Sequence, residues 1–221
     1  MALYVDSAFL HDIMNVAATI PLAGATTNPS ILLAGRERGQ DLSPESVLGA
    51  LLRSIGGDIF MQPGATDEAA MLQEALAYIQ ASPKRVIPKI PMTQVGMRVG
   101  DRLKHQQQRI AFTAVTSVTQ AYCAAMVGAD FIIPYYSRLE RVGVNASERL
   151  AEMADVLHNA GSPTRILVAS IKSPEEAARA LLAGVHDLTV APQVLLEMVT
   201  DPLSEEAVEG FTRDWRKMNE P

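Results

Sequence analysis

The stretch RVIPKIPMT, residues 85–93, consists mostly of apolar and β-branched residues around a single lysine, Lys89. A short run of this kind is typical of a strand that is buried on both faces of a parallel sheet. A segment with helical periodicity follows it along the chain. Together the two segments predict a strand and its following helix, one βα unit.

Seven further apolar runs repeat this arrangement. With the first, they predict strands at residues 2–6, 24–28, 58–62, 85–90, 109–115, 130–136, 165–170 and 187–192. The strand starts are about 26 residues apart on average, which suits a (β/α)8 TIM barrel. The alternative is an open doubly wound sheet, which usually carries a glycine-rich phosphate motif. Neither GxGxxG nor GxxxxGK(S/T) occurs, so the closed barrel is favoured.

Helical patterns are clearest at residues 66–80, 145–161 and 173–184. Ser173 with the proline after it predicts a capped helix start, and Gly184 predicts the end of that helix. Each of these segments lies between two predicted strands, as alternating βα units require.

The C-terminal segment, residues 204–218, predicts one more amphipathic helix. Its Phe211 and Trp215 are four residues apart, so they share a face that needs a surface to cover. That surface is either the barrel's own or that of a neighbouring subunit. We therefore expect a single barrel domain over residues 1–221 with an extra C-terminal helix.

The overall composition indicates a globular protein of a reducing compartment. The chain has 221 residues, of which 48% are hydrophobic and 20% charged, enough to bury a large core. Its net charge of −6 disfavours nucleic-acid and membrane partners. Cys123 is the only cysteine, and we find neither a signal peptide nor an apolar run long enough to span a membrane. These features predict a cytoplasmic protein.

Polar residues stand at the ends of seven predicted strands, where a βα barrel carries its active site. Taken singly, each has a simpler explanation as a helix cap, a turn residue, a strand former or a core aromatic. Their convergence favours a functional site. The candidates are Asp6, Thr27, Asn28, Gln62, Lys89, Thr113, Tyr135, Arg138, Ser170 and Lys172.

Lys89 is the most informative candidate. Side chains alternate along a strand, so if Ile87 fills the barrel, Lys89 points into it as well. Desolvation could lower the lysine pKa from about 10.4 to about 7.5. Near pH 7.5, roughly half of the lysine would then be free amine, which can form a Schiff base with a carbonyl. The simpler explanation is a lysine paired with a carboxylate such as Asp6, or one reaching to the rim. Pro88 removes a backbone donor from this interior strand.

Schiff-base cleavage of a C–C bond also needs a base, polar groups for the substrate hydroxyls and often a group that binds a phosphate. Asp6 is the candidate for the base or for a residue that holds a water. Arg138 and Lys172 follow strands six and seven, close to where barrels often bind phosphate. As ordinary surface charges they would instead pair with Glu140 and Glu175.

Segments along nearly the whole chain resemble, in order, the small transaldolase and fructose-6-phosphate aldolase family. The resemblance implies a βα barrel, class I aldol chemistry without metal or cofactor, and a ring-like homo-oligomer, a pentamer or decamer, in which the C-terminal helix reaches a neighbouring subunit. The more specific motifs are TTNPS and KIPMT. The segments are VDSAFL (5–10), GATTNPSILL (24–33), VIPKIPMT (86–93), Pro134 to Leu139, VASIKSP (168–174) and HDLTVAPQVLLEMVTDPLSEEAVEGFTRDW (186–215).

The same resemblance implies a role for each site residue. Lys89 is the Schiff-base lysine, and Asp6 and Asn28, with the neighbouring Thr27, contact the substrate. The phosphate lies at Arg138, Ser170 and Lys172.

Three positions separate the two activities of the family. These positions are Gln62, Thr113 and Tyr135. The resemblance implies that transaldolases of the family carry a glutamate, a threonine and a phenylalanine there. Glutamine and tyrosine at these places are similar to the aldolase branch, in which the three side chains hold a water for proton transfer. We therefore predict an aldolase that converts fructose 6-phosphate to dihydroxyacetone and glyceraldehyde 3-phosphate, with transaldolase as the alternative.

Other functions remain open at this point. One is a non-catalytic barrel that binds sugar phosphates, and another is a pyridoxal-phosphate barrel, whose lysine also forms a Schiff base. Metal-dependent aldol chemistry is poorly supported, because His11, His105, His158 and His186 show no ligand spacing. We expect His11 and His158 to lie on helices and Cys123 to pack in one.

Overall fold

The computed structural model describes residues 1–37 and 43–219. Within these residues, eight parallel strands close into a barrel in sequence order, and the first strand pairs with both the second and the eighth. The (β/α)8 barrel predicted from the sequence is therefore confirmed, and the open sheet was the wrong alternative. The strands are β1 (Ala2–Asp6), β2 (Gly24–Thr26), β3 (Asp58–Met61), β4 (Val86–Pro91), β5 (Ala111–Val115), β6 (Phe131–Pro134), β7 (Arg165–Ile171) and β8 (Asp187–Val190).

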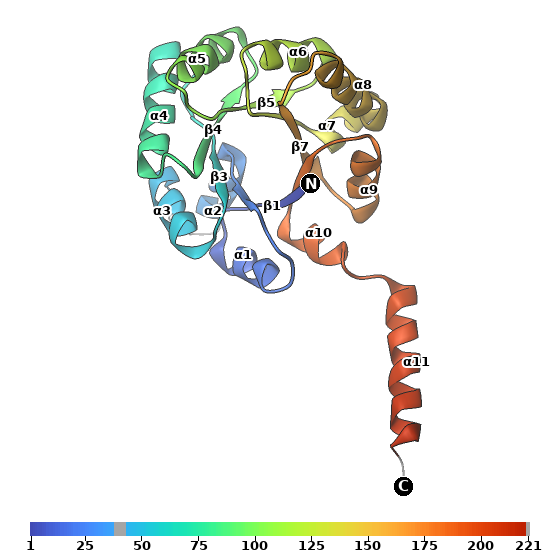
Figure 1. Ribbon diagram of the computed structural model, residues 1–221. Helices are drawn as coiled ribbons and strands as arrows, with labels where there is room; N and C mark the ends of the chain where they lie inside the picture. The colour runs from blue at the N-terminus through green and yellow to red at the C-terminus, as the bar shows by residue number, and fades with distance from the viewer. Residues whose placement is uncertain (38–42, 220–221) are drawn as a thin grey trace.

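Helices form a ring around the outside of the barrel (Figure 1). At least one helix follows each strand, as the alternating pattern predicts. The helices are α1 (Leu10–Ala17), α2 (Pro29–Glu37), α3 (Pro44–Ser54), α4 (Glu68–Ala81), α5 (Gln94–His105), α6 (Val118–Met126), α7 (Tyr136–Arg141), α8 (Ala146–Asn159), α9 (Pro174–Leu182), α10 (Pro192–Glu197) and α11 (Pro202–Met218).

Several strands are shorter than the apolar runs predict. The runs at 24–28 and 130–136 end as strands at Thr26 and Pro134, because the residues that follow start the next helix. Asn28, for example, accepts a hydrogen bond at Oδ1 from the Ile31 N–H at 3.0 Å, as a capping residue does. The polar residues near the ends of these two runs, Asn28 and Tyr135, thus lie on the loops above the barrel.

The four predicted helices are confirmed, and their ends agree with the structure to within a few residues. Ser173 accepts a hydrogen bond from the Glu176 N–H at the start of α9, and Gly184 after that helix has φ 84°, a conformation that favours glycine. His11 and His158 lie on α1 and α8. Cys123 lies on α6 as expected, but it is exposed, so the prediction that it packs was wrong.

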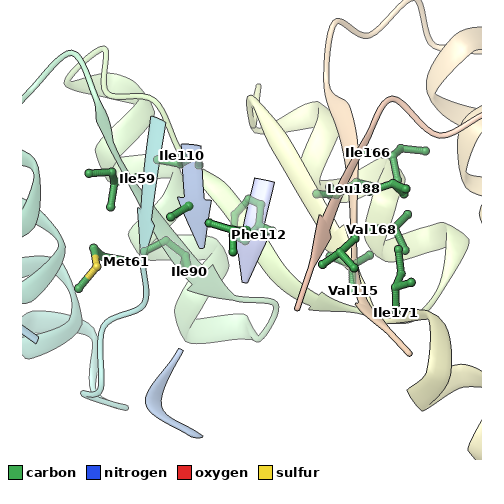
Figure 2. Packing of buried hydrophobic residues seen from close by; sticks show 14 of the residues in the cluster. Ile59, Met61, Ile90, Ile110, Phe112, Val115, Ile166, Val168, Ile171 and Leu188 are labelled. Atoms are coloured by element: carbon green, nitrogen blue, oxygen red, sulfur yellow. The ribbon is translucent and has the colours of Figure 1, made fainter. Parts of the chain in front are cut away.

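The larger part of the core lies between the strands and the helices. Outward-facing side chains such as Ile90, Phe112 and Val168 fill this layer (Figure 2). Packing is close where α5 lies against a side chain of β5. A Cβ added to Gly100 would stand 2.4 Å from the Phe112 ring, so only glycine fits there. The helices are therefore held tightly against the barrel.

A second, smaller core fills the inside of the barrel. The Phe60 ring makes edge contacts with the rings of Tyr4 and Phe131, at centroid distances of 5.4 and 5.1 Å. Ile87 belongs to the same cluster. At the N-terminal ends of the strands, Arg109 pairs with Asp58 and Arg165 with Asp187. The lower end of the barrel is thus filled.

Helix α11 projects away from the barrel (Figure 1). None of its side chains is buried, and Phe211 and Trp215 are 71% and 67% exposed. The barrel of this chain is therefore not the surface that they cover, which was one of the two alternatives. In the part of the chain that the structure describes, no helix has the length and apolar character to span a membrane.

Candidate active site

A cavity of about 390 Å³ opens at the C-terminal ends of the strands. Its lining comes from the ends of several strands and from the loops that follow them. Seven of the predicted site residues meet there. They are Asp6, Asn28, Lys89, Tyr135, Arg138, Ser170 and Lys172.

Lys89 lies at the inner end of this cavity and is only 2% exposed. Its Nζ donates a hydrogen bond to the Thr27 carbonyl oxygen at 2.9 Å. Burial lowers the pKa of Lys89 from its usual value, and Arg138 lowers it further, while the Asp6 carboxylate raises it. Among the described residues Lys89 has no ion pair closer than 4 Å, so neither direct pairing nor placement at the rim explains it.

The strand around Lys89 keeps its alternation despite Pro88. Pro88 lies in β4 opposite Met61 and is buried. Ile87 packs inside the barrel as predicted, and Lys89, two residues further, enters the same interior. The proline therefore does not turn the lysine away from the cavity.

Asp6 is held by two hydroxyl groups in series. Thr26 Oγ1 on β2 donates to Asp6 Oδ1 at 2.6 Å. Thr26 Oγ1 is also 2.6 Å from Thr189 Oγ1 on β8. Both threonines are buried, with exposed fractions of 0% and 1%. One carboxylate oxygen is thus fixed on the side of the barrel wall.

Tyr135 and Thr113 form a second polar pair. Tyr135 lines the cavity, and its hydroxyl is 2.7 Å from Thr113 Oγ1. Thr113 comes just before Ala114, which has φ 60° where the pairing of β5 with β6 shifts register. Bulges of this kind re-aim side chains at the ends of barrel strands. Thr113 reaches the site through Tyr135 rather than by lining the cavity.

Two predicted residues lie differently from the rest. Gln62 lines a neighbouring cavity of about 570 Å³ that is bounded by α2, α3 and α4. The Thr27 hydroxyl points to the Phe60 carbonyl oxygen and the Met61 sulfur, at 3.4 and 3.3 Å. Thr27 therefore contacts Lys89 through its backbone carbonyl and not through its side chain.

The basic side of the cavity is formed by Arg138 and Lys172. The Arg138 guanidinium lies over the Tyr135 ring, 4.4 Å from its centroid, which is a cation–π contact. Neither cation has an ion-pair partner within 4 Å among the described residues, so the expected pairs with Glu140 and Glu175 do not form. Their charge faces a cavity that also contains Lys89.

Glu176 connects the two segments that carry these cations. Its Oε2 accepts a hydrogen bond from the Lys172 N–H at 2.8 Å and another from Ser137 Oγ at 2.7 Å. Ser170, on the same segment as Lys172, has φ 61° at an irregularity in the pairing of β7 with β8. Such a conformation is uncommon for serine and clusters at functional sites.

Sequence reasoning assigned no polar residue to the eighth strand and so missed Thr189. The signal was present, because alternation along DLTV places Asp187 and Thr189 on the face that does not carry Leu188 and Val190. Ser7, Phe9 and Asp12 also line the cavity and follow the first strand. Nothing in their spacing marks them.

One comparison with known proteins bears on this site. The family model described as transaldolase/fructose-6-phosphate aldolase matches residues 3–220, nearly the whole length of the chain. It is a family of sugar-phosphate aldolase and transaldolase enzymes. The match agrees with the barrel and with a cavity that combines a buried lysine, a carboxylate and two cations. The chain therefore belongs to the transaldolase/fructose-6-phosphate aldolase family.

Proposed function

We propose that this protein is a class I aldolase that cleaves the C3–C4 bond of a ketose phosphate such as fructose 6-phosphate, through a Schiff base on Lys89. The observation that carries the proposal is the buried Lys89 amine, whose pKa burial lowers, at the inner end of a cavity that Asp6 also lines. A free amine is the form that attacks a carbonyl.

In the first step the Lys89 amine attacks the C2 carbonyl of the substrate, and loss of water leaves an iminium. The positive nitrogen then draws electrons from the neighbouring bonds. Asp6 takes the proton from the C4 hydroxyl, and the C3–C4 electron pair moves toward the iminium. The products of this step are glyceraldehyde 3-phosphate and an enamine on Lys89.

In the second step the enamine carbon takes up a proton, and water hydrolyses the new iminium to release dihydroxyacetone. Tyr135 is the candidate proton donor, or the residue that holds the donor water, because it lines the cavity and its hydroxyl bonds Thr113. The two unpaired cations, Arg138 and Lys172, suit the substrate phosphate, which prefers charge-assisted hydrogen bonds.

Transaldolase is the second candidate, and one observation favours it. Gln62, which would help to hold the water in an aldolase, lines the neighbouring cavity instead. If water is less well held, the enamine waits for an aldose phosphate and transfers its three-carbon unit. Tyr135, which lines the same cavity as Lys89, supports the aldolase as the first choice.

The test is to count the glyceraldehyde 3-phosphate released per subunit from fructose 6-phosphate with no acceptor aldehyde. Continued turnover supports the aldolase, whereas release that stops near one equivalent supports the transaldolase. We expect Lys89→Met to abolish both continued turnover and the release of a first equivalent, while the protein stays folded. The matched control is Lys84→Met, because Lys84 is an exposed lysine just before β4 and should be dispensable.

Two results would contradict the Schiff-base mechanism. The first is wild-type turnover in Lys89→Met. The second is failure of borohydride to trap the ketose on Lys89, which would favour a non-catalytic binder. A yellow protein as purified would point to pyridoxal phosphate on the lysine.

A further inference from the structure

The hydroxyl groups of Thr26 and Thr189 form a short chain that ends on Asp6. The two hydroxyl oxygens are 2.6 Å apart, and Thr26 Oγ1 is 2.6 Å from Asp6 Oδ1. The three residues come from β2, β8 and β1, which are neighbours in the barrel. Both threonines are buried and neither lines the cavity, so this chain approaches Asp6 from the barrel wall.

Counting protons fixes the direction of the chain. An ionised carboxylate only accepts hydrogen bonds, and a threonine hydroxyl has a single proton to donate. Thr26 uses that proton on Asp6 Oδ1. The oxygen of Thr26 must then accept, so the proton between the two threonines comes from Thr189. The chain therefore runs from Thr189 through Thr26 to Asp6.

We propose that Thr189 is a positioning residue for Asp6. Its hydroxyl donates to Thr26 and so holds the Thr26 proton on Asp6 Oδ1, which leaves the other carboxylate oxygen turned to the cavity. This inference rests on the proposed function, in which that oxygen removes the C4 hydroxyl proton. Hydrogen bonds in series strengthen one another in a buried site, and a fixed base is more effective than a rotating one.

The place of Thr189 determines which kinetic step it affects. It is not among the described residues that line the cavity, and the Lys89 amine is bound to the backbone carbonyl of Thr27 rather than to a hydroxyl of this chain. Substrate binding and Schiff-base formation should therefore be independent of Thr189. Only the cleavage step, in which Asp6 takes a proton, depends on the chain, so its loss should lower kcat and leave KM unchanged.

The test uses Thr189→Val, which keeps the shape of threonine and removes the hydroxyl, and Thr189→Ser, which keeps the hydroxyl. We expect kcat for glyceraldehyde 3-phosphate release to fall about fivefold in Thr189→Val, the scale of one net hydrogen bond between neutral groups. Thr189→Ser should recover most of the loss. KM and borohydride trapping of the ketose on Lys89 should stay at wild-type levels in both.

The chain offers a matched control in Thr164, another threonine that is 1% exposed. Its hydroxyl donates to the Ala129 carbonyl oxygen at 2.7 Å, just before β7 and away from the cavity. Thr164→Val removes a buried hydroxyl of the same kind, so it should lower the melting temperature and leave kcat unchanged. If Thr189→Val did not fold, Thr189→Cys would answer the same question, since a thiol is only a weak donor.

Three outcomes would overturn the inference. They are a wild-type kcat in Thr189→Val, an equal loss in Thr189→Ser, and an effect confined to KM. Each presupposes that the wild-type enzyme forms the trapped adduct with the ketose. Absence of that adduct in the wild type would instead overturn the proposed function, and the role of Thr189 with it, so the two failures are told apart.

Discussion

Lys89 combines two properties that normally exclude each other, an ionisable amine and almost complete burial. Removing an ammonium from water is costly, so burial favours the neutral amine and lowers the pKa of Lys89. One backbone carbonyl, that of Thr27, holds the amine in place without the full charge of a direct ion pair. Asp6 works against the lowering from a greater distance. The lowered pKa increases the share of free amine, which is the form that the proposed chemistry requires.

A prediction at the same scale concerns Tyr135. Tyr135→Phe removes the hydroxyl that lies 2.7 Å from Thr113 Oγ1 and with it the group proposed for proton transfer to the enamine. We expect the ratio of transaldolase to aldolase activity to rise at least about tenfold, because positioned proton transfer contributes about 10²–10⁴ to a rate. The measurement compares dihydroxyacetone release with transfer to an aldose phosphate.

The matched control for this prediction is the next residue. Tyr136 bonds Ser147 through its hydroxyl at 2.8 Å and is packed outside the barrel, so Tyr136→Phe should leave the ratio unchanged. An unchanged ratio in Tyr135→Phe itself would remove the main reason for choosing the aldolase.

Among the elements, the strand ends and the segments that follow them carry the site, and two of these segments are tied together by one carboxylate. Glu176, in the first turn of α9, accepts from the Lys172 N–H and from Ser137 on α7. Arg138 is the next residue on α7. The distance between the two cations of the cavity therefore depends on a residue that does not itself line it.

We predict that Glu176→Ala raises KM for fructose 6-phosphate about tenfold, the scale of a hydrogen bond to a charged group. KM for dihydroxyacetone in the synthetic direction should not change, since this compound has no phosphate. Steady-state kinetics with both substrates check this. Glu176→Gln, which can still accept both bonds, and Glu175→Ala, which removes an exposed neighbour, should resemble the wild type. Equal effects on both substrates would contradict the role in phosphate binding.

A pH-dependent contact joins β7 and β8 at the other end of the barrel. His186 Nδ1 accepts the Ile166 N–H at 3.0 Å, so this nitrogen must be unprotonated. Burial, with a smaller effect of Arg165, lowers the pKa of His186 below its ordinary value of about 6.5. The unfolded chain then binds the proton more readily than the folded one. Stability is therefore present above about pH 6.5 and is lost as the pH falls through the lowered pKa.

We expect the urea midpoint to be lower at pH 5 than at pH 7.5, and His186→Asn to reduce this difference. Asparagine stays neutral, and its side-chain oxygen can accept the Ile166 N–H. The same change at the exposed His158 should leave the difference as in the wild type. A pH difference that His186→Asn does not alter would mean that other groups cause it.

At the scale of the whole molecule, the barrel and α11 differ in how much of their apolar surface is buried. The barrel buries its strands twice, inside against the inner cluster and outside against the helices. Helix α11 buries nothing on its own chain and exposes Val208, Phe211 and Trp215 along one side. We propose that this side packs on a neighbouring copy in a homo-oligomer, as the family resemblance implies.

This proposal predicts that Phe211→Ala with Trp215→Ala shifts the protein toward the monomer while the barrel stays folded, because the apolar area available to the contact is lost. Light scattering after gel filtration measures the mass, and circular dichroism measures the fold. The control is Glu209→Ala with Arg213→Ala, a charged pair on the same helix, which should keep the oligomer. A wild-type protein that is already monomeric would contradict the proposal.

The sequence by itself determined the barrel. Eight apolar runs at regular spacing, each followed by a helical pattern, leave few ways to bury both faces of every strand, and closure is one of them. It also determined that Lys89 enters the interior, because alternation with Ile87 is a local property of the strand. The positions of seven site residues around one cavity follow from the rule that βα barrels gather their strand ends at one face.

Only the tertiary structure decided the finer relations between these residues. The hydroxyl chain from Thr189 to Asp6 crosses three strands far apart in sequence, and no local pattern carries their register. The bulges at Ala114 and Ser170 arise from mismatched pairing between neighbouring strands, which one strand cannot show. Gln62 lines the neighbouring cavity together with residues of α2, α3 and α4, an arrangement that the third strand alone cannot show. Periodicity fixes the face on which a side chain lies, but contacts between distant strands and helices fix what it touches.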